Sequence, residues 1–125
     1  MNIPSHLLYT KEHEWIKIEG NTATVGITDF AQGELGDIIF VELPDAGQIL
    51  VKEDPFGTIE AVKTVADLFA PLSGKVLDLN ENLEDDPALV NSDAFVRGWL
   101  IKIEISSKEE LDDLLTPDLY RKILE

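Results

Sequence analysis

The sequence predicts a mainly β fold of the sandwich or barrel type, covered on one side by short C-terminal helices. Short runs rich in Val, Ile, Phe and Trp recur as far as Ile105, and Pro or Gly separates many of them. After Ile105 the apolar residues change to helical spacing. Of the 125 residues 44% are hydrophobic, which is enough for a core. We expect one domain over residues 1–125, with its helical part at about 107–125.

The first expected elements are a β-hairpin and a short helix. Trp15–Glu19 and Thr22–Ile27 alternate in part between apolar and polar residues. The Gly20-Asn21 link between them is typical of a two-residue hairpin turn. A helix that ends near Leu35 should follow, because Thr28 is a favourable N-cap residue.

The middle of the chain predicts further short β-strands. The first is rich in Ile, Phe and Val, and turn-forming Pro or Gly residues punctuate the series. The expected strands are Asp37–Leu43, Gln48–Val51, Pro55–Val62, Val65–Ala70, Lys75–Leu79 and Trp99–Ile105.

Two helix starts are expected at the C-terminal end. Ser107 is followed three residues later by Glu110, which is the pattern of a capping box, and leucines at helical spacing come next. Thr116 and Pro117 indicate a second start, since proline at the first helical position gives up an N–H that has no helical partner there.

Charge and composition exclude several classes of function. The chain has 10 Lys and Arg against 25 Asp and Glu, a net charge of −15, which argues against nucleic acid and anionic membranes as partners. That charge serves solubility, and it also suits docking to basic surfaces of partner proteins. No cysteine is present, so disulfides and thiolate chemistry are excluded. No apolar run is long enough to span a bilayer.

The N-terminal residues do not resemble a signal or transit peptide, so we expect a cytoplasmic bacterial protein, with a processed mitochondrial matrix form as the alternative. A metal site is not expected, because His13 has only His6 as a second histidine. A packing or hydrogen-bonding role is the better expectation for His13. We expect Trp15 and Trp99 to be core or sheet-surface aromatic residues.

Lys63 is the residue that calls for an explanation. It lies between two expected strands, at the tip of a hairpin, among small apolar residues and without an adjacent cation. A catalytic lysine would need burial or a neighbouring cation to lower its pKa, and a tip offers neither. An ordinary surface lysine is the plain alternative. A projecting lysine in a rigid turn is better suited to covalent attachment of a mobile group. Glu60 provides a charge that a modifying enzyme can recognise.

Glu60-Ala-Val-Lys63 and Ala66-Asp-Leu-Phe-Ala-Pro-Leu-Ser-Gly-Lys-Val76 together resemble the lipoylation segment of the glycine cleavage system H protein family. The resemblance extends in order over roughly residues 6 to 124. It includes His13-Glu-Trp-Ile16, Gly26-Ile-Thr-Asp-Phe-Ala-Gln32, Leu35-Gly-Asp-Ile38, Phe40-Val-Glu-Leu-Pro44 and Gly98-Trp-Leu-Ile-Lys-Ile103. It implies a barrel-sandwich hybrid of two antiparallel sheets, with a lipoyl-lysine hairpin and short C-terminal helices.

The resemblance also implies a function without catalysis by the chain itself. Lipoic acid would be attached to Lys63 by a lipoate-attaching enzyme. The implied partners are a pyridoxal-phosphate glycine decarboxylase, a tetrahydrofolate-dependent aminomethyltransferase and a flavin dihydrolipoamide dehydrogenase. The carried aminomethyl group bears an amine, which is cationic near neutral pH.

Particular residues take roles by the same resemblance. Glu14 and Asp67 match positions that shield the loaded arm in a cleft. Glu12 stands where relatives commonly have a small hydroxyl residue. Its carboxylate either adds to that cleft or simply faces solvent. The residues that the lipoate-attaching enzyme is expected to recognise are Glu60, Ala61, Val62 and Thr64. Ala61 departs from the usual serine. Ala94 and Val96 replace a proline and a glycine that are common in relatives and so could alter the loop before the last strand.

Other functions remain open from the residues. A paralogous carrier could serve lipoate relay or sulfur oxidation, and an unmodified interaction module is a further alternative. A biotin carrier fits poorly, because Val62-Lys63-Thr64 lacks the flanking methionines usual there. A lysine-based enzyme fits least.

Overall fold

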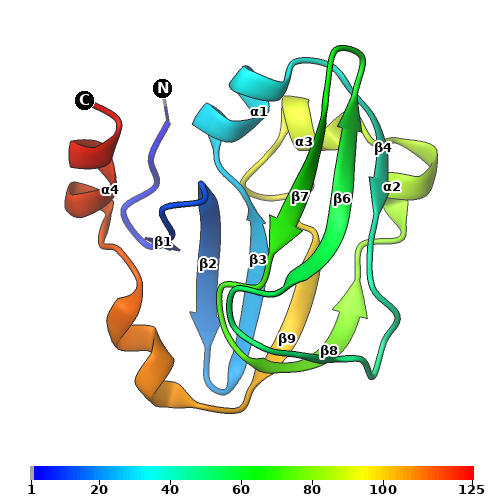
Figure 1. The fold of residues 1–125 in the computed structure, drawn as a ribbon. Helices are drawn as coiled ribbons and strands as arrows, with labels where there is room; N and C mark the ends of the chain where they lie inside the picture. The colour runs from blue at the N-terminus through cyan, green and yellow to red at the C-terminus, as the bar shows by residue number, and fades with distance from the viewer. Residues whose placement is uncertain (1) are drawn as a thin grey trace.

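The computed structural model describes residues 2–125 and consists of two antiparallel sheets with short helices around them (Figure 1). One sheet has six strands in the order β1-β2-β3-β9-β8-β5, and the other has three in the order β4-β6-β7. The six-stranded sheet comprises β1 (Leu8–Tyr9), β2 (Glu14–Glu19), β3 (Thr22–Ile27), β5 (Ile49–Leu50), β8 (Gly74–Leu79) and β9 (Ile101–Ile105). The smaller sheet comprises β4 (Ile38–Glu42), β6 (Pro55–Ala61) and β7 (Val65–Phe69). The predicted fold class is confirmed.

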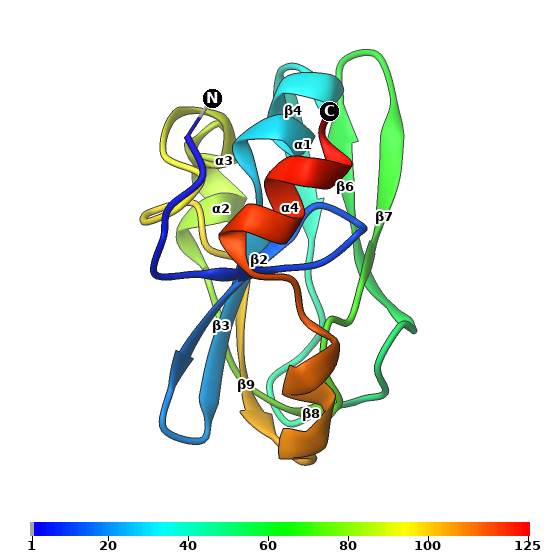
Figure 2. The same cartoon turned by 90° about the vertical axis from the view of Figure 1, so that its left-hand side faces the viewer.

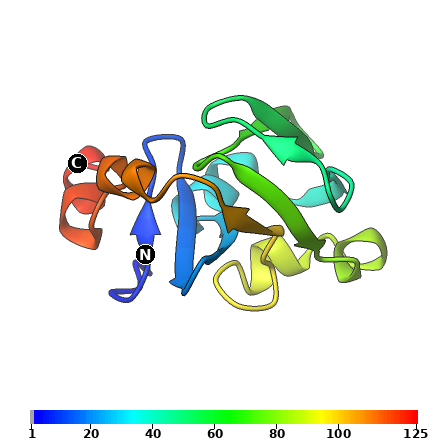
Figure 3. The same cartoon turned by 90° about the horizontal axis from the view of Figure 1, so that it is seen from below.

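The helical segments are all short. They are α1 (Asp29–Leu35), α2 (Asn82–Asp85), α3 (Leu89–Ser92), the 3₁₀ helix η1 (Lys108–Asp113) and α4 (Pro117–Ile123). The last two form the helical part at the C-terminus, and Figure 3 shows them at the end of the molecule where β1 lies. Within residues 2–125, none of these helices is long and apolar enough to cross a membrane.

The β2–β3 hairpin forms as the sequence predicts. Glu19 pairs with Thr22, and Gly20 has a φ of +61°, a left-handed conformation that glycine adopts without a steric penalty. Trp15 on β2 lies across Gly26 on β3, where an added Cβ would come within 2.4 Å of the indole ring. The indole N–H also donates to the Ala94 carbonyl at 2.9 Å, so the loop before β9 is tied to the sheet.

The main core lies between the two sheets. Its fully buried residues include Val25, Ile59, Leu72, Ile101 and Ile103, which come from both sheets and the connection between β7 and β8. Each such side chain contributes roughly 1.5–3 kcal/mol when it leaves water. A second cluster under the C-terminal helices contains Leu7, Tyr9, Trp15 and Tyr120, and it joins β1 and β2 to α4.

Local capping signals are right for two helices. The Thr28 hydroxyl accepts from the Ala31 N–H at the start of α1, and the Thr116 hydroxyl accepts from the Leu119 N–H at the start of α4. Pro117 occupies the first turn of α4 as predicted.

The predicted capping box at Ser107 is wrong. Within the described residues the Ser107 side chain makes no capping bond, and the segment is the 3₁₀ helix η1. The Glu110 carboxylate instead accepts from the Ser73 N–H at 2.7 Å and from the Ser73 hydroxyl at 2.8 Å. The physical reason is competition: a distant residue offers the carboxylate two donors, whereas the local box offers one.

Replacing Glu110 by Ala should therefore destabilise the protein by about 1–3 kcal/mol, because two part-buried donors of Ser73 lose a charged acceptor. Ser107→Ala is the matched control and should change the free energy of unfolding by less than about 0.5 kcal/mol. Urea unfolding of both variants measures the difference. Equal losses would mean that the local capping box forms in solution.

Candidate functional site

Lys63 occupies the tip of the β6–β7 hairpin, as the sequence predicts, and the tip stands at one end of the molecule near α1 (Figure 1). The turn is closed by a hydrogen bond from the Ala61 N–H to the Thr64 carbonyl at 2.8 Å. A second bond runs from the Val62 N–H to the Asp37 carbonyl at 3.0 Å and ties the tip to the segment before β4. The backbone under Lys63 is thus held from two sides.

The lysine side chain itself is exposed. Its Cε lies 3.4 Å from the position that a Cβ on Gly36 would take, so the missing side chain at Gly36 leaves room for the aliphatic stem. Among residues 2–125, Lys63 takes part in no ion pair. An exposed amine without a neighbouring cation has nothing to activate it as a catalyst, but it is accessible to an enzyme that acylates it.

The flanking residues differ in what they present. Val62 and Val65 are 73% and 60% exposed, which is unusual for valine, and Glu60 and Thr64 are exposed as well. Ala61 is only 4% exposed and faces the core. A modifying enzyme can therefore touch Glu60, Val62 and Thr64 directly, whereas Ala61 can influence recognition only through the shape of the turn.

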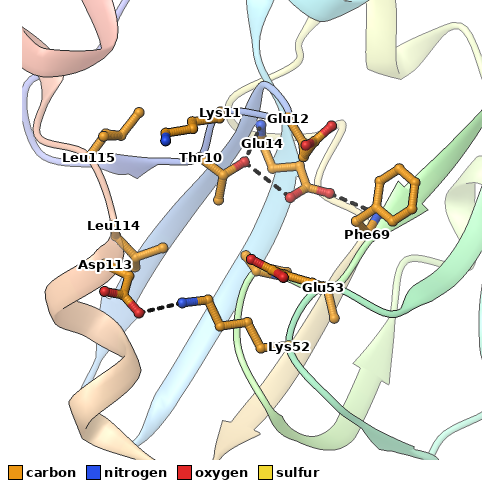
Figure 4. Close-up of a pocket in the computed structure, with 12 residues that line it drawn as sticks. Thr10, Lys11, Glu12, Glu14, Lys52, Glu53, Phe69, Asp113, Leu114 and Leu115 are labelled. Carbon is orange, nitrogen blue, oxygen red and sulfur yellow. Dashed lines mark hydrogen bonds and ion pairs between the residues drawn. The ribbon is translucent and has the colours of Figure 1, made fainter.

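A cavity of about 640 Å³ opens between the two sheets and the C-terminal segment (Figure 4). Four segments line it: the β1–β2 turn, the loop before β6, the chain from the end of β7 to Pro71, and the stretch from η1 to α4. Its lining residues are Thr10, Lys11, Glu12, Glu14, Lys52, Glu53, Phe69, Ala70, Pro71, Asp113, Leu114 and Leu115.

Glu14 is the buried acid of this cavity. It is 3% exposed, and one carboxylate oxygen accepts from the Thr10 hydroxyl at 3.2 Å while the other accepts from the Phe69 N–H at 3.1 Å. The pKa of Glu14 is raised to about 8, chiefly by burial and in small part by the charge of Glu12, while these two hydrogen bonds act to lower it. A carboxyl poised near neutral pH inside a cavity can gain or lose its proton in response to a ligand.

The other two acids expected near Glu14 differ in position. Glu12 is exposed and lines the cavity. Asp67 is exposed on β7, two residues before Phe69, and lies outside the cavity lining. Because side chains alternate along a strand, Asp67 shares the strand face of Phe69 and lies on the path from the hairpin tip to the cavity.

Several lining residues could not be identified from the sequence. The Lys52 ammonium and the Asp113 carboxylate form an ion pair at 2.6 Å that bridges the far side of the cavity, although the two residues are distant in the chain (Figure 4). Glu53 has a φ of +76°, a left-handed conformation that costs a non-glycine residue about 1–2 kcal/mol. Nothing in the local sequence marks either feature.

His13 acts as a packing and hydrogen-bonding residue, as predicted. Its Nδ1 lies 2.9 Å from the Tyr120 hydroxyl, and its ring lies against Phe30 with centroids 4.6 Å apart. Burial lowers its pKa, although the charges of Glu12 and Glu34 act in the opposite direction. Within residues 2–125, no group of three His, Asp or Glu side chains is arranged to hold a metal ion.

Comparison with known proteins agrees with this geometry. Residues 7–125 match the family model described as glycine cleavage H-protein. The glycine cleavage system H protein of Staphylococcus haemolyticus is 53% identical over 124 residues, which cover 99% of this chain and 98% of that protein. The corresponding protein of Carboxydothermus hydrogenoformans is 53% identical over 123 residues, which cover 98% of this chain and 95% of that protein.

A solved structure shows the same fold. The crystal structure of a glycine cleavage system H protein from Mycobacterium marinum superposes with a TM-score of 0.88 at 36% identity, and the match covers 98% of each chain. Members of this family are non-catalytic lipoyl carriers of the glycine cleavage system, and this chain belongs to the glycine cleavage H-protein family.

Proposed function

We propose that this chain carries lipoate in amide linkage on Lys63 and moves an aminomethyl group between the enzymes of glycine cleavage. The observation that carries the proposal is the presentation of Lys63. It is exposed at the tip of a hairpin whose backbone is fixed by the Ala61–Thr64 and Val62–Asp37 bonds. A lipoate-attaching enzyme would meet Glu60, Val62 and Thr64 beside it.

Lipoate on Lys63 would supply a dithiolane that takes up the aminomethyl group at a pyridoxal-phosphate glycine decarboxylase, gives it up at a tetrahydrofolate-dependent aminomethyltransferase, and is reoxidised by a dihydrolipoamide dehydrogenase. The chain's part is to present and protect that group. We propose that residues 1–125 act as one carrier domain and, since the relatives compared are bacterial, that it works in a bacterial cytoplasm.

Glu14 is suited to hold the amine of the carried group. Phe69, which donates its N–H to Glu14, lies five positions beyond Thr64, so the cavity begins ~17 Å along β7 from the turn. The far end of a long arm, rather than the lysine itself, would reach it. A cation beside Glu14 favours the ionised carboxylate and adds a charge-assisted hydrogen bond.

Neighbouring groups support this role. Glu12 adds a second carboxylate at the cavity, and Asp67 lies beside the path that the arm would follow. The Thr10 hydroxyl and the Phe69 N–H fix the orientation of the Glu14 carboxylate before any ligand arrives. A site arranged in advance binds without spending free energy on ordering its groups.

Lipoylation itself gives the first test. Intact mass and peptide mapping of protein from its native source should show a lipoyl group on Lys63. Lys63→Arg should remove the modification completely, because arginine is not acylated by lipoate-attaching enzymes. Lys75→Arg, at another exposed lysine, should leave it unchanged. A lipoyl group on a different lysine, or none in a cell with an active lipoylation system, would contradict the proposal.

The protective role of Glu14 is tested by the lifetime of the aminomethyl-loaded protein. Glu14→Gln keeps the size of the side chain but removes the charge, and loss of one charged hydrogen bond should shorten that lifetime by about tenfold. Lipoylation should be unaffected. Glu19→Gln, an exposed acid on the same strand, is the control. Hydrolysis followed by mass spectrometry measures the lifetime, and equal rates in all three proteins would rule out the role.

The ionisation of Glu14 should also be visible in stability. Its pKa is about 8 in the folded protein against 4.5 in a free side chain, so between these pH values the folded state binds more protons than the unfolded chain. The free energy of unfolding therefore falls as pH rises through this window, by on the order of 1 kcal/mol per pH unit. Glu14→Gln lacks this contribution, so wild type should lose stability relative to the variant from about pH 5 to about pH 8. Denaturant unfolding at both pH values measures this, and parallel curves would mean that Glu14 ionises normally.

A further inference from the structure

The residue next to Glu14 is held in an uncommon backbone conformation. His13 has a φ of +66°, in the left-handed region, where non-glycine residues are strained. It lies in the turn between β1 and β2, with Glu12 before it and Glu14 after it. The direction in which Glu14 leaves this turn depends on that conformation, so whatever stabilises His13 also decides where the Glu14 carboxylate points.

Contacts from α1 and α4 stabilise this conformation. The Thr28 N–H donates to the His13 carbonyl at 3.0 Å, and the His13 ring lies against Phe30 of α1. The Tyr120 hydroxyl of α4 lies 2.9 Å from His13 Nδ1 and 2.7 Å from the Thr28 hydroxyl. One buried hydroxyl group thus joins the strained turn to two helices.

The hydrogen bonds in this group can all be satisfied in one arrangement. The Thr28 oxygen already accepts from the Ala31 N–H, so the Thr28 hydroxyl can donate its own proton to the Tyr120 oxygen. Tyr120 then donates to His13 Nδ1, which accepts only when the imidazole is neutral. Burial lowers the pKa of His13 and raises the pKa of Tyr120, and both shifts favour this arrangement.

Tyr120 has little freedom to move. It is fully buried, and its ring stacks on Tyr9 with centroids 4.6 Å apart and planes 7° apart. Tyr9 and Leu115 exchange two backbone hydrogen bonds, at 2.9 and 2.7 Å, just before α4 begins. In Figure 2, α4 lies in front of the sheet and just above the dark blue N-terminal strand, and α4 and β1 are in contact.

We propose that Tyr120 is a positioning residue for Glu14: through its bond to His13, α4 holds the β1–β2 turn in the conformation that directs the Glu14 carboxylate into the cavity. The C-terminal helix would then be a working part of the carrier and not only a cover for the sheet. The structural part of this inference concerns the chain alone, while its consequence for the carried group depends on the proposed function.

Two tyrosine variants separate positioning from general stability. Tyr120→Phe and Tyr9→Phe each remove one hydroxyl group from the same stacked pair, but only the Tyr120 hydroxyl contacts His13, since Tyr9 donates to the Pro4 carbonyl at 2.6 Å. The readout is the titration of Glu14 in the unlipoylated full chain, followed by NMR of its ¹³C-labelled carboxyl group.

Tyr120→Phe should lower the pKa of Glu14 by at least half a unit toward its ordinary value, on the order of the one-unit spread of carboxyl pKa values in proteins. The reason is that a loosened turn lets water reach the carboxyl. Tyr9→Phe should leave it unchanged. The other charged groups that line the cavity are present in both variants, so they cancel in the comparison. They are Lys11, Glu12, Lys52, Glu53 and Asp113. The same Glu14 titration in both variants would overturn the proposal.

A second variant keeps the test decisive if Tyr120→Phe folds poorly. His13→Ala removes the other partner of the bond, so it should shift the Glu14 titration in the same direction. If the two residues act through one contact, the double variant should shift it no further than the larger single shift. Additive shifts would show that Tyr120 and His13 act separately, which contradicts the proposal.

The lipoylated protein then tests the consequence. The lifetime of the aminomethyl-loaded protein should fall in Tyr120→Phe and stay unchanged in Tyr9→Phe. If Glu14→Gln shortens that lifetime and Tyr120→Phe does not, the positioning role is overturned while the proposed function stands. If Glu14→Gln has no effect, the protective function fails, and the NMR titration alone decides whether Tyr120 positions Glu14.

Discussion

One hydrogen bond joins the two sheets at the place where the cavity forms. The Glu14 carboxylate comes from the six-stranded sheet, and the Phe69 N–H that it accepts belongs to the edge strand β7 of the smaller sheet. Edge strands carry unpaired backbone donors, which a neighbouring chain could otherwise use for pairing. Glu14 satisfies one of these donors and is buried in doing so. The contact closes the gap between the sheets. The burial that comes with it raises the pKa of Glu14, although the hydrogen bond from Phe69 acts to lower that pKa.

Two residues near Glu14 and the cavity have unfavourable backbone conformations. His13, next to Glu14, and Glu53, which lines the cavity, both have left-handed backbone conformations that disfavour non-glycine residues. Each is fixed by contacts from elsewhere in the fold, His13 by Tyr120 and Thr28 and Glu53 by a 2.7 Å bond from its N–H to the Ala70 carbonyl. Strain at two such positions is tolerated because tertiary contacts determine the backbone there.

Local signals in the sequence predict much of this fold but little of the cavity. The Gly20-Asn21 turn, the Thr28 and Thr116 caps and the position of Lys63 each depend on a few adjacent residues, and all are confirmed. The Ser107 capping box also followed a local rule, and it is wrong because Ser73 offers Glu110 a better pair of donors. The Lys52–Asp113 ion pair and the Tyr120–His13 bond join distant segments, so no spacing in the sequence could indicate them.

The distance between the two ends of the site explains why the hairpin should be rigid. The proposed attachment point, Lys63, is at the tip of β6–β7, and the cavity begins at the other end of β7. If the hairpin bent, the distance between lysine and cavity would vary, and an arm of fixed length would reach Glu14 only part of the time. Pairing with β4 and the Val62–Asp37 bond both oppose such bending. Mobility can then belong to the arm alone, which lets one group either project toward a partner enzyme or fold back to Glu14 without any change in the fold.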